Sequence, residues 1–340
     1  MYKGYKIIVN TAAGRRRYMQ YLIPQVLSNE IVDRYDIWVN TNDRCDIEFF
    51  VRLSKRFEKI HLIYQPDGIV NGIASINAFY RFCVEEDAIY IKMDDDVVWL
   101  EPDYVRKMVD FRLDNKNCFL VSPLVINNAL STYVLQTKGK IKLNKYMYSR
   151  CSHRILWERG SFAVQLHSWF LEKYLKTGKY ERLYCEEVPW ALTRFSINSI
   201  VWFGTDMKAI NGEVTGDDEE YLSCIRPTQI GRCNLINGNC IIAHFAFAPQ
   251  RRMLDECMIL EQYGDYLCKS WKADPILNSL NEEVQSIMRD INERREKIMK
   301  EEPLYKQVDN NSLSKKIKKK IKDFINYEVD KHRTVKYIVE

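Results

Sequence analysis

The chain has 340 residues, of which 46% are hydrophobic and 29% charged, so it is long enough to bury a large core. Its net charge of +5 lies in residues 312–340, with nine basic and four acidic side chains, and the neutral body argues against a nucleic-acid partner. No apolar run reaches the roughly 18 residues of a membrane-spanning helix, and the start MYKGYKIIVN lacks a signal peptide's apolar region, so we expect a cytoplasmic protein.

Short apolar runs rich in β-formers alternate with helix-like stretches over the first 122 residues. The expected strands are 6–10, 35–40, 60–64, 88–93 and 118–122. The expected helices are 15–27, 46–60, 72–86 and 101–113. Repeated strand–helix–strand units predict an α/β fold with a mostly parallel sheet and helices on both faces. Such sheets bind ligands at the carboxyl ends of their strands.

The pattern is looser after residue 123. We expect an irregular polar segment, then helices and strands, then a charged helical region and a short linker before the basic tail. The irregular segment is 123–160, the helices are 164–176 and 186–197, the strands are 199–203 and 238–247, the charged helical region is 249–300, and the linker is 306–314.

Three consecutive aspartates follow the fourth predicted strand in the sequence YIKMDDDVVW, residues 90–99. Residues i and i+2 of an extended segment point the same way, so Asp94 and Asp96 can converge on one point while Asp95 turns aside. Two carboxylates that face one cavity suit Mg²⁺ or Mn²⁺. The alternative is a solvated turn before the helix at 101, but the position at the ligand edge of the sheet favours a metal site.

A strand that ends in Asp-x-Asp, about 90 residues into an α/β domain, resembles the metal motif of nucleotide-sugar glycosyltransferases with the GT-A fold. KMDDDV is especially similar to the triple-aspartate form of the Fringe and β-1,3-galactosyltransferase groups. The resemblance covers roughly residues 4–250 and implies a mixed, mostly parallel central sheet flanked by helices. It implies a GT-A-like catalytic domain over 1–248, with a nucleotide-binding half (1–122) and an acceptor half (123–248). The sequence pattern adds a helical C-terminal extension (249–305) and a linker with a basic tail (306–340).

The resemblance also implies roles for the residues at matching positions. Asp96 would ligate the metal that bridges the nucleotide diphosphate, and Asp94 would approach the ribose or the metal. His244, near the end of a late strand, would be a further metal or phosphate ligand, although a histidine in an apolar strand can equally be a core residue. The nucleotide-binding candidates are Thr11, Ala12 and Arg15 in the loop NTAAGR, Asn42 or Asp43 after the second strand, and Asp94 and Asp95.

An acidic loop, TGDDEEYLS (215–223), resembles the motif that supplies the general base in many GT-A enzymes. Asp218 is the first candidate for that base, followed by Asp217 and then Glu219. The alternative is that Asp217 or Asp218 caps the next helix. Trp190, Trp202 and Tyr221 are candidates for stacking on acceptor sugars, with burial in the core as the alternative.

These features predict an inverting, hexosyltransferase-type enzyme that uses Mn²⁺ or Mg²⁺. It would move a sugar from a nucleotide-diphosphate sugar, with UDP favoured by the resemblance, to a glycan or lipid-linked glycan in surface polysaccharide synthesis. One alternative is a nucleotidyltransferase that makes an activated sugar, although NTAAGRRR is a poor version of its glycine-rich phosphate loop. The other is a non-catalytic protein that binds a sugar or nucleotide.

The segment SLSKKIKKKIKDFINY (312–327) predicts a basic amphipathic helix. Its apolar stripe contains Leu313, Ile317, Ile321 and Phe324, with six lysines around it. Each lysine near an anionic leaflet contributes about 1 kcal/mol of attraction to the membrane. We therefore consider the hypothesis that the tail holds the protein at the inner face of a membrane. A solvated helix or a disordered tail is the alternative.

Overall fold

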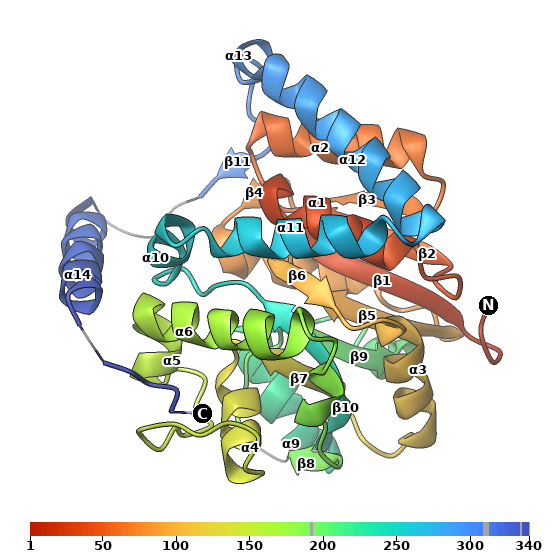
Figure 1. Ribbon diagram of the computed structural model, residues 1–340. Coiled ribbons are helices and arrows are strands. Elements are labelled where there is room, and N and C mark those ends of the chain that lie inside the picture. The colour runs from red at the N-terminus through yellow and green to blue at the C-terminus, as the bar shows by residue number, and fades with distance from the viewer. Residues whose placement is uncertain (191–192, 309–312, 334, 340) are drawn as a thin grey trace.

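The computed structural model describes residues 1–190, 193–308, 313–333 and 335–339 (Figure 1). In these residues, nine strands form one central sheet in the order β3-β2-β1-β5-β9-β7-β10-β6, with β8 paired to β10. The strands are β1 (Lys6–Ala13), β2 (Arg34–Val39), β3 (Ile60–Tyr64), β5 (Ala88–Met93), β6 (Val97–Leu100), β7 (Val121–Ile126), β8 (Val188–Trp190), β9 (Ser199–Phe203) and β10 (Asn234–His244). A separate small sheet pairs β4 (Ile69–Val70) with β11 (Lys306–Gln307).

The sheet is mixed. Strands β3, β2, β1 and β5 are parallel, as are β7 and β10, whereas β9 is antiparallel to both β5 and β7. The edge strands β6 and β8 both run antiparallel to β10. The predicted α/β architecture, a central sheet flanked by helices, is confirmed.

Helices cover both faces of the sheet. Successive residues of a strand point to opposite faces, so each strand contributes side chains to two hydrophobic cores. Ile7 and Val9 of β1 lie in one hydrophobic core, and Ile8 lies in the other. In the first half of the chain the helices are α1 (Arg16–Leu27), α2 (Arg44–Arg56), the 3₁₀ helix η1 (Gly72–Phe82), α3 (Tyr104–Asp114), α4 (Ala129–Thr137), α5 (Arg154–Glu158) and α6 (Gly160–Phe170).

The second half adds shorter helices and a C-terminal group. They are η2 (Leu171–Leu175), η3 (Tyr180–Leu183), α7 (Gly204–Lys208), α8 (Asp218–Glu220), η4 (Tyr221–Ile225), α9 (Arg226–Ile230), α10 (Arg251–Glu256), α11 (Ile259–Trp271), α12 (Pro275–Glu293), α13 (Arg295–Ile298) and α14 (Leu313–Lys331). The N-cap Asp274 and Pro275 begin α12, which buries Val284 and Ile291 in the core that contains α1 and α2. The C-terminal extension therefore packs on its own chain.

Several predicted elements differ from the structure, and three of the differences bear on the site. Residues 123–160 are not irregular, since they contain the end of β7 together with α4 and α5. The helix predicted at 186–197 is wrong because Val188–Trp190 form β8 on the edge of β10, although residues 191–192 lie outside the described part of the chain. The first strand runs through Ala13 because its register with β2 continues to Val39.

None of the helices in the described residues combines the length and hydrophobicity needed to cross a bilayer.

Candidate functional site

The aspartate triplet forms the tight turn that joins β5 to β6. The backbone N–H of Asp94 donates to the Asn198 carbonyl at 2.9 Å, and the N–H of Val97 donates to the Asp94 carbonyl at 3.2 Å. Strand β6 then pairs with the end of β10, and the Phe245 N–H donates to the Asp96 carbonyl at 2.8 Å. This pairing brings His244, 148 positions after Asp96 in the sequence, next to the Asp96 side chain.

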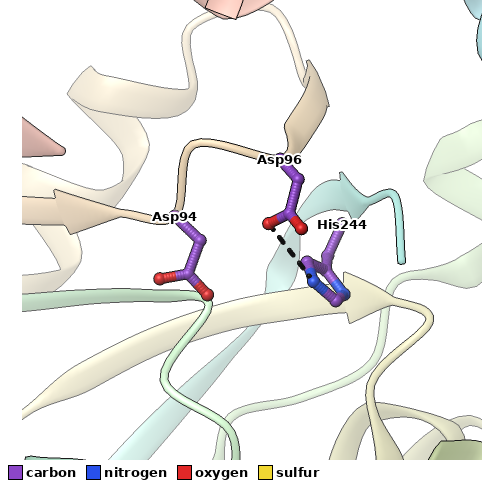
Figure 2. A group of neighbouring side chains, drawn as sticks. All are labelled: Asp94, Asp96 and His244. Carbon is purple, nitrogen blue, oxygen red and sulfur yellow. Dashed lines mark ion pairs between the residues drawn. The ribbon is translucent and has the colours of Figure 1, made fainter. Parts of the chain in front are cut away.

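Asp94, Asp96 and His244 lie together at this turn, and their potential ligand atoms are all within 4.8 Å of one another. Figure 2 shows the two aspartates projecting from the same turn toward the end of the strand that carries His244. His244 Nε2 lies 3.4 Å from Asp96 Oδ1, and Nδ1 lies 3.2 Å from the Asn127 carbonyl, to which it can donate. With Nδ1 so occupied, Nε2 is the nitrogen available to a metal. The two carboxylates offer the oxygen ligands that Mn²⁺ and Mg²⁺ prefer, and the imidazole nitrogen is a third potential ligand for a divalent metal.

Two arginines neutralise the buried carboxylates. Arg15 lies 2.9 Å and Arg251 3.5 Å from Asp96 Oδ2. Burial alone would raise the pKa of Asp96, but Arg15, His244 and Arg251 together hold it well below its usual range. Burial opposes the charged form of His244, but the neighbouring Asp96 raises its pKa above the ordinary histidine value. Asp96 is therefore ionised, and His244 retains a proton beside it to a higher pH than usual.

The raised pKa of His244 predicts that metal binding is pH-dependent. A proton and a metal compete for Nε2, so the affinity for Mn²⁺ should rise as the pH rises through that pKa, while Asp96 stays ionised throughout. Calorimetric titration of Mn²⁺ between pH 6 and 8 in buffers of different ionisation enthalpy would measure the affinity and the released proton. His244→Ala should bind Mn²⁺ more weakly and lose the pH dependence over this range. The same slope in both proteins would contradict ligation by His244.

The metal-ligand candidates line a cavity of about 580 Å³, a size typical of small-molecule sites. Three groups of side chains in its wall bear on what it can bind. The cations are Arg15, Lys92, Arg194 and Arg251; the carboxylates are Asp94, Asp95, Asp96, Asp217, Asp218 and Glu219; and the aromatic side chains are Trp157 and Phe247. Arginine and lysine beside a metal-binding cluster favour a ligand with several negative charges.

The predicted nucleotide-binding residues divide into two groups. Ala12, Arg15, Asp94 and Asp95 line the cavity, and Asp95 holds Arg15 in place by accepting hydrogen bonds from its guanidinium and, at 3.0 Å, from the Gly14 N–H. The other group consists of Thr11 and Asn42, which are described residues but are not part of the cavity wall.

Thr11 and Asn42 are occupied elsewhere. Because β1 continues through Ala13, Thr11 is buried in the sheet, where its hydroxyl lies 3.1 Å from that of Tyr35. The Asn42 side chain exchanges two hydrogen bonds with the backbone of Tyr305, at 2.8 and 2.9 Å. Asp43 caps α2. At the ends of β1 and β2 the cavity is instead lined by Gly14, Asn40 and Thr41.

The acidic loop places its three carboxylates differently. Asp217 caps α8 by accepting from the Glu220 N–H at 3.1 Å and pairs with Arg194 at 3.0 Å. Glu219 pairs with the same arginine at 2.7 Å. Asp218 is only 5% exposed and accepts a hydrogen bond from the Tyr80 hydroxyl at 3.1 Å. Burial raises the pKa of Asp218 despite the opposing charge of Lys92.

The three aromatic residues predicted to contact an acceptor lie away from the cavity. Trp202 is fully buried and stacks on Tyr90, and Tyr221 is also in the core, which was the alternative for both. Trp190 is half-buried on β8, and its indole N–H donates to the Thr193 carbonyl at 3.1 Å. None of these three described side chains is part of the cavity wall.

Two aromatic residues that the sequence patterns did not single out for this role line the cavity. The rings of Trp157 and Phe247 lie 4.4 Å apart, and Phe247 also contacts the His244 ring. Trp157 lies in a segment predicted to be irregular, and the strand predicted at 238–247 ends at His244, which leaves Phe247 in the segment after it.

Lys92 is a further functional candidate that the sequence reasoning missed. Its side chain is almost fully buried, and Nζ lies 2.8 Å from Asp94 Oδ1. A signal for it was present, because Lys92 interrupts an otherwise apolar strand two residues before Asp94 and must point the same way.

The sequence matches no protein-family model and no curated protein. Among solved structures it is similar to 4-diphosphocytidyl-2C-methyl-D-erythritol synthase from Anaerococcus prevotii DSM 20548, at 10% identity and a TM-score of 0.40 over 76% of this chain and 97% of that one. It is similar to CMP:2-keto-3-deoxy-manno-octonic acid synthetase complexed with CTP, at 10% identity and a TM-score of 0.39 over 76% and 100%. GalNAc-T7 with UDP, GalNAc and Mn²⁺ gives 10% identity and a TM-score of 0.43 over 86% and 58%. Likeness at this level carries no argument about activity, which must come from the site.

Proposed function

We propose that the protein is a metal-dependent glycosyltransferase that moves a sugar from a nucleotide-diphosphate sugar, with UDP as the first candidate, to a hydroxyl acceptor. The observation that carries this proposal is the convergence of Asp94, Asp96 and His244 in a cavity that also contains Arg15 and Arg251. A diphosphate alone would be repelled by the carboxylates. A divalent ion held by them, together with the two arginines, supplies the compensating positive charge.

Different residues of the cavity would bind different parts of the donor. Asp94, Asp96 and His244 would hold Mn²⁺ or Mg²⁺, which when bound supplies Lewis-acid stabilisation of the departing diphosphate. Arg15 and Arg251 lie against Asp96, and we assign to them the contacts with the phosphate oxygens. Gly14, Asn40 and Thr41, at the carboxyl ends of β1 and β2, form the part of the wall assigned to the nucleoside.

Asp218 is the proposed general base. As the acceptor oxygen attacks the anomeric carbon, the bond from that carbon to the phosphate oxygen breaks and the acceptor proton passes to the Asp218 carboxylate. Attack from the side opposite the departing phosphate inverts the anomeric configuration. The raised pKa of Asp218 makes it a stronger base than a surface carboxylate, and nearby Lys92 favours its ionised form.

The acceptor proposed here is a glycan or a lipid-linked glycan, as used in surface polysaccharide synthesis. Trp157 and Phe247 offer the aromatic surface on which a sugar ring can pack. Trp157→Ala is expected to raise the KM for the acceptor about tenfold, with little change in UDP affinity, because stacking contacts of this kind contribute about 1 kcal/mol or more. Acceptor titrations at saturating donor would measure the change. Trp190→Ala is the matched control, and an equal effect in both variants would refute the assignment to Trp157.

Product analysis tests the reaction type. The protein with Mn²⁺ would be incubated with UDP-sugars and glycan acceptors, and separately with nucleoside triphosphates and sugar phosphates. Release of UDP with a glycosylated acceptor supports the proposal. Release of pyrophosphate in the second reaction would instead identify a nucleotidyltransferase. Donor binding with no product from either reaction would favour a non-catalytic binding protein.

A further inference from the structure

Helix α14 exposes a row of large apolar side chains. Its side chains that are about half exposed, from 47% to 55%, are Ile317, Ile321, Phe324, Ile325 and Val329. Ile317, Ile321, Ile325 and Val329 are spaced four residues apart and therefore share one side of the helix. The predicted amphipathic helix is present, although the side chain of Leu313 lies outside the described residues. We call Ile317, Ile321, Phe324, Ile325 and Val329 the apolar row.

The opposite side of α14 is fixed to the body of the protein. Asp330 is 2% exposed and accepts hydrogen bonds from the Ser161 N–H at 2.9 Å and from its hydroxyl at 2.6 Å. The Tyr327 hydroxyl donates to Glu256, and the Arg252 guanidinium lies 3.8 Å from the Tyr327 ring centre. Ile325 and Val329 each lie about 160° around the helix from Tyr327, so these contacts direct that part of the apolar row outward. Phe324, about 60° from Tyr327, is at the edge of the row.

The chain after α14 returns to the body and fixes the far end of the helix. The Tyr337 N–H donates to the Gln165 side chain at 2.8 Å, and Ile338 pairs with Leu143. Both Tyr337 and Ile338 are buried. The apolar row is therefore displayed in a defined orientation rather than on a disordered tail.

Positive charge is concentrated along the first part of α14. Six lysines lie between residues 315 and 322, and among them Lys318, Lys320 and Lys322 are exposed. Because residues before 312 are neutral in sum, the attraction to a negative surface is concentrated at this helix. Lysines beside exposed isoleucine and phenylalanine are complementary to anionic headgroups above an acyl layer.

Helix α14 also lies beside segments that border the cavity, since it contacts α6 and α10 (Figure 1). Glu256 and Arg252, which contact Tyr327, belong to α10, whose first residue is the cavity residue Arg251. Ser161, which contacts Asp330, is four residues after the cavity residue Trp157. A surface bound by α14 would therefore be close to the side of the cavity assigned to the acceptor.

We propose that α14 docks the protein on an anionic lipid bilayer, with the apolar row in the interface and the lysines at the headgroups. Docking in this orientation would bring the cavity close to acceptors that are embedded in the membrane. The acceptor class would therefore be a lipid-linked glycan. The docking stands on α14 alone, whereas the choice of acceptor rests on the proposed function.

The docking is tested by cosedimentation of the full chain, without nucleotide, with vesicles of phosphatidylcholine alone or mixed with phosphatidylglycerol. We expect binding to the mixed vesicles that weakens with salt, and at least about tenfold weaker binding by Ile321→Ser/Ile325→Ser. Ile276→Ser/Met258→Ser, which also replaces two exposed apolar residues outside α14, is the matched control and should bind like wild type. Equal binding by all three proteins, or none by wild type, would overturn the proposal. So would self-association that depends on the apolar row in the absence of binding to the mixed vesicles.

Two further assays separate this proposal from the proposed function. The apolar-row variant should retain transfer to a water-soluble acceptor and lose transfer to a lipid-linked acceptor in mixed vesicles. Vesicle binding without transfer to either acceptor would leave the docking intact and count against the enzymatic assignment. Metal-dependent binding of UDP without vesicle binding would support the nucleotide site and overturn the docking.

Discussion

Replacing Asp96 with asparagine is expected to lower the rate of sugar transfer about a thousandfold, which corresponds to roughly 4 kcal/mol of transition-state stabilisation. Asparagine offers a neutral oxygen in place of a carboxylate that faces His244, Arg15 and Arg251. The variant therefore loses a metal ligand and leaves two arginines with less compensating charge. Initial rates with a UDP-sugar and Mn²⁺, measured with Mn²⁺ varied, would give the loss and show whether added metal restores activity.

Asp87→Asn is the control for this variant. Asp87 lies just before the other end of β5, and its exposed carboxylate pairs with Lys6 at 3.6 Å. We expect its activity and unfolding temperature to be near those of wild type. If Asp96→Asn were as active as Asp87→Asn while folded, the metal assignment would be wrong.

Asp218→Asn is expected to lower kcat by about 10²–10⁴-fold, the usual contribution of a general base, while the affinity for UDP changes little. The amide can still accept from the Tyr80 hydroxyl but cannot remove a proton from the acceptor. Because burial raises the pKa of Asp218, the wild-type rate should fall as the pH drops through that raised pKa, where the base becomes protonated.

A matched control comes from the same helix. Glu220 is exposed and is not among the described residues that line the cavity, so Glu220→Gln should keep both kcat and its pH profile. Steady-state rates across the acidic range would compare the three proteins. A wild-type kcat in the Asp218→Asn variant would exclude Asp218 as the general base and leave Asp217 and Glu219 as the candidates.

The part of the site that local patterns could predict is the part that one strand supplies. The apolar run before Asp94 identified β5, and the alternation of side chains along it indicated that Asp94 and Asp96 face the same way. The same alternation applied to Lys92, whose charge in a buried strand was an available signal. At the carboxyl end of β1 the predicted strand stopped three residues too early, and Thr11 therefore lies in the sheet and not in the expected loop.

The remaining part of the site depends on contacts between distant segments. His244 reaches Asp96 only because β6 pairs antiparallel with β10, and a sequence pattern does not specify which strands become neighbours. Trp157 and Phe247 meet because α5 packs against the segment after β10. Trp202 is buried because β9 lies in the middle of the sheet. An aromatic residue in an apolar run therefore indicated burial more reliably than sugar contact.

Calorimetric binding of UDP, with and without Mn²⁺, to wild type and to the double variant Asp94→Asn/Asp96→Asn is the most direct test of the central claim. That claim is that the aspartate turn, together with His244, binds a metal that holds a nucleotide diphosphate. We predict that wild type binds UDP only with Mn²⁺ present and that the folded double variant does not bind it. Equal binding of UDP by the two proteins, or the same affinity with and without Mn²⁺, would contradict the claim.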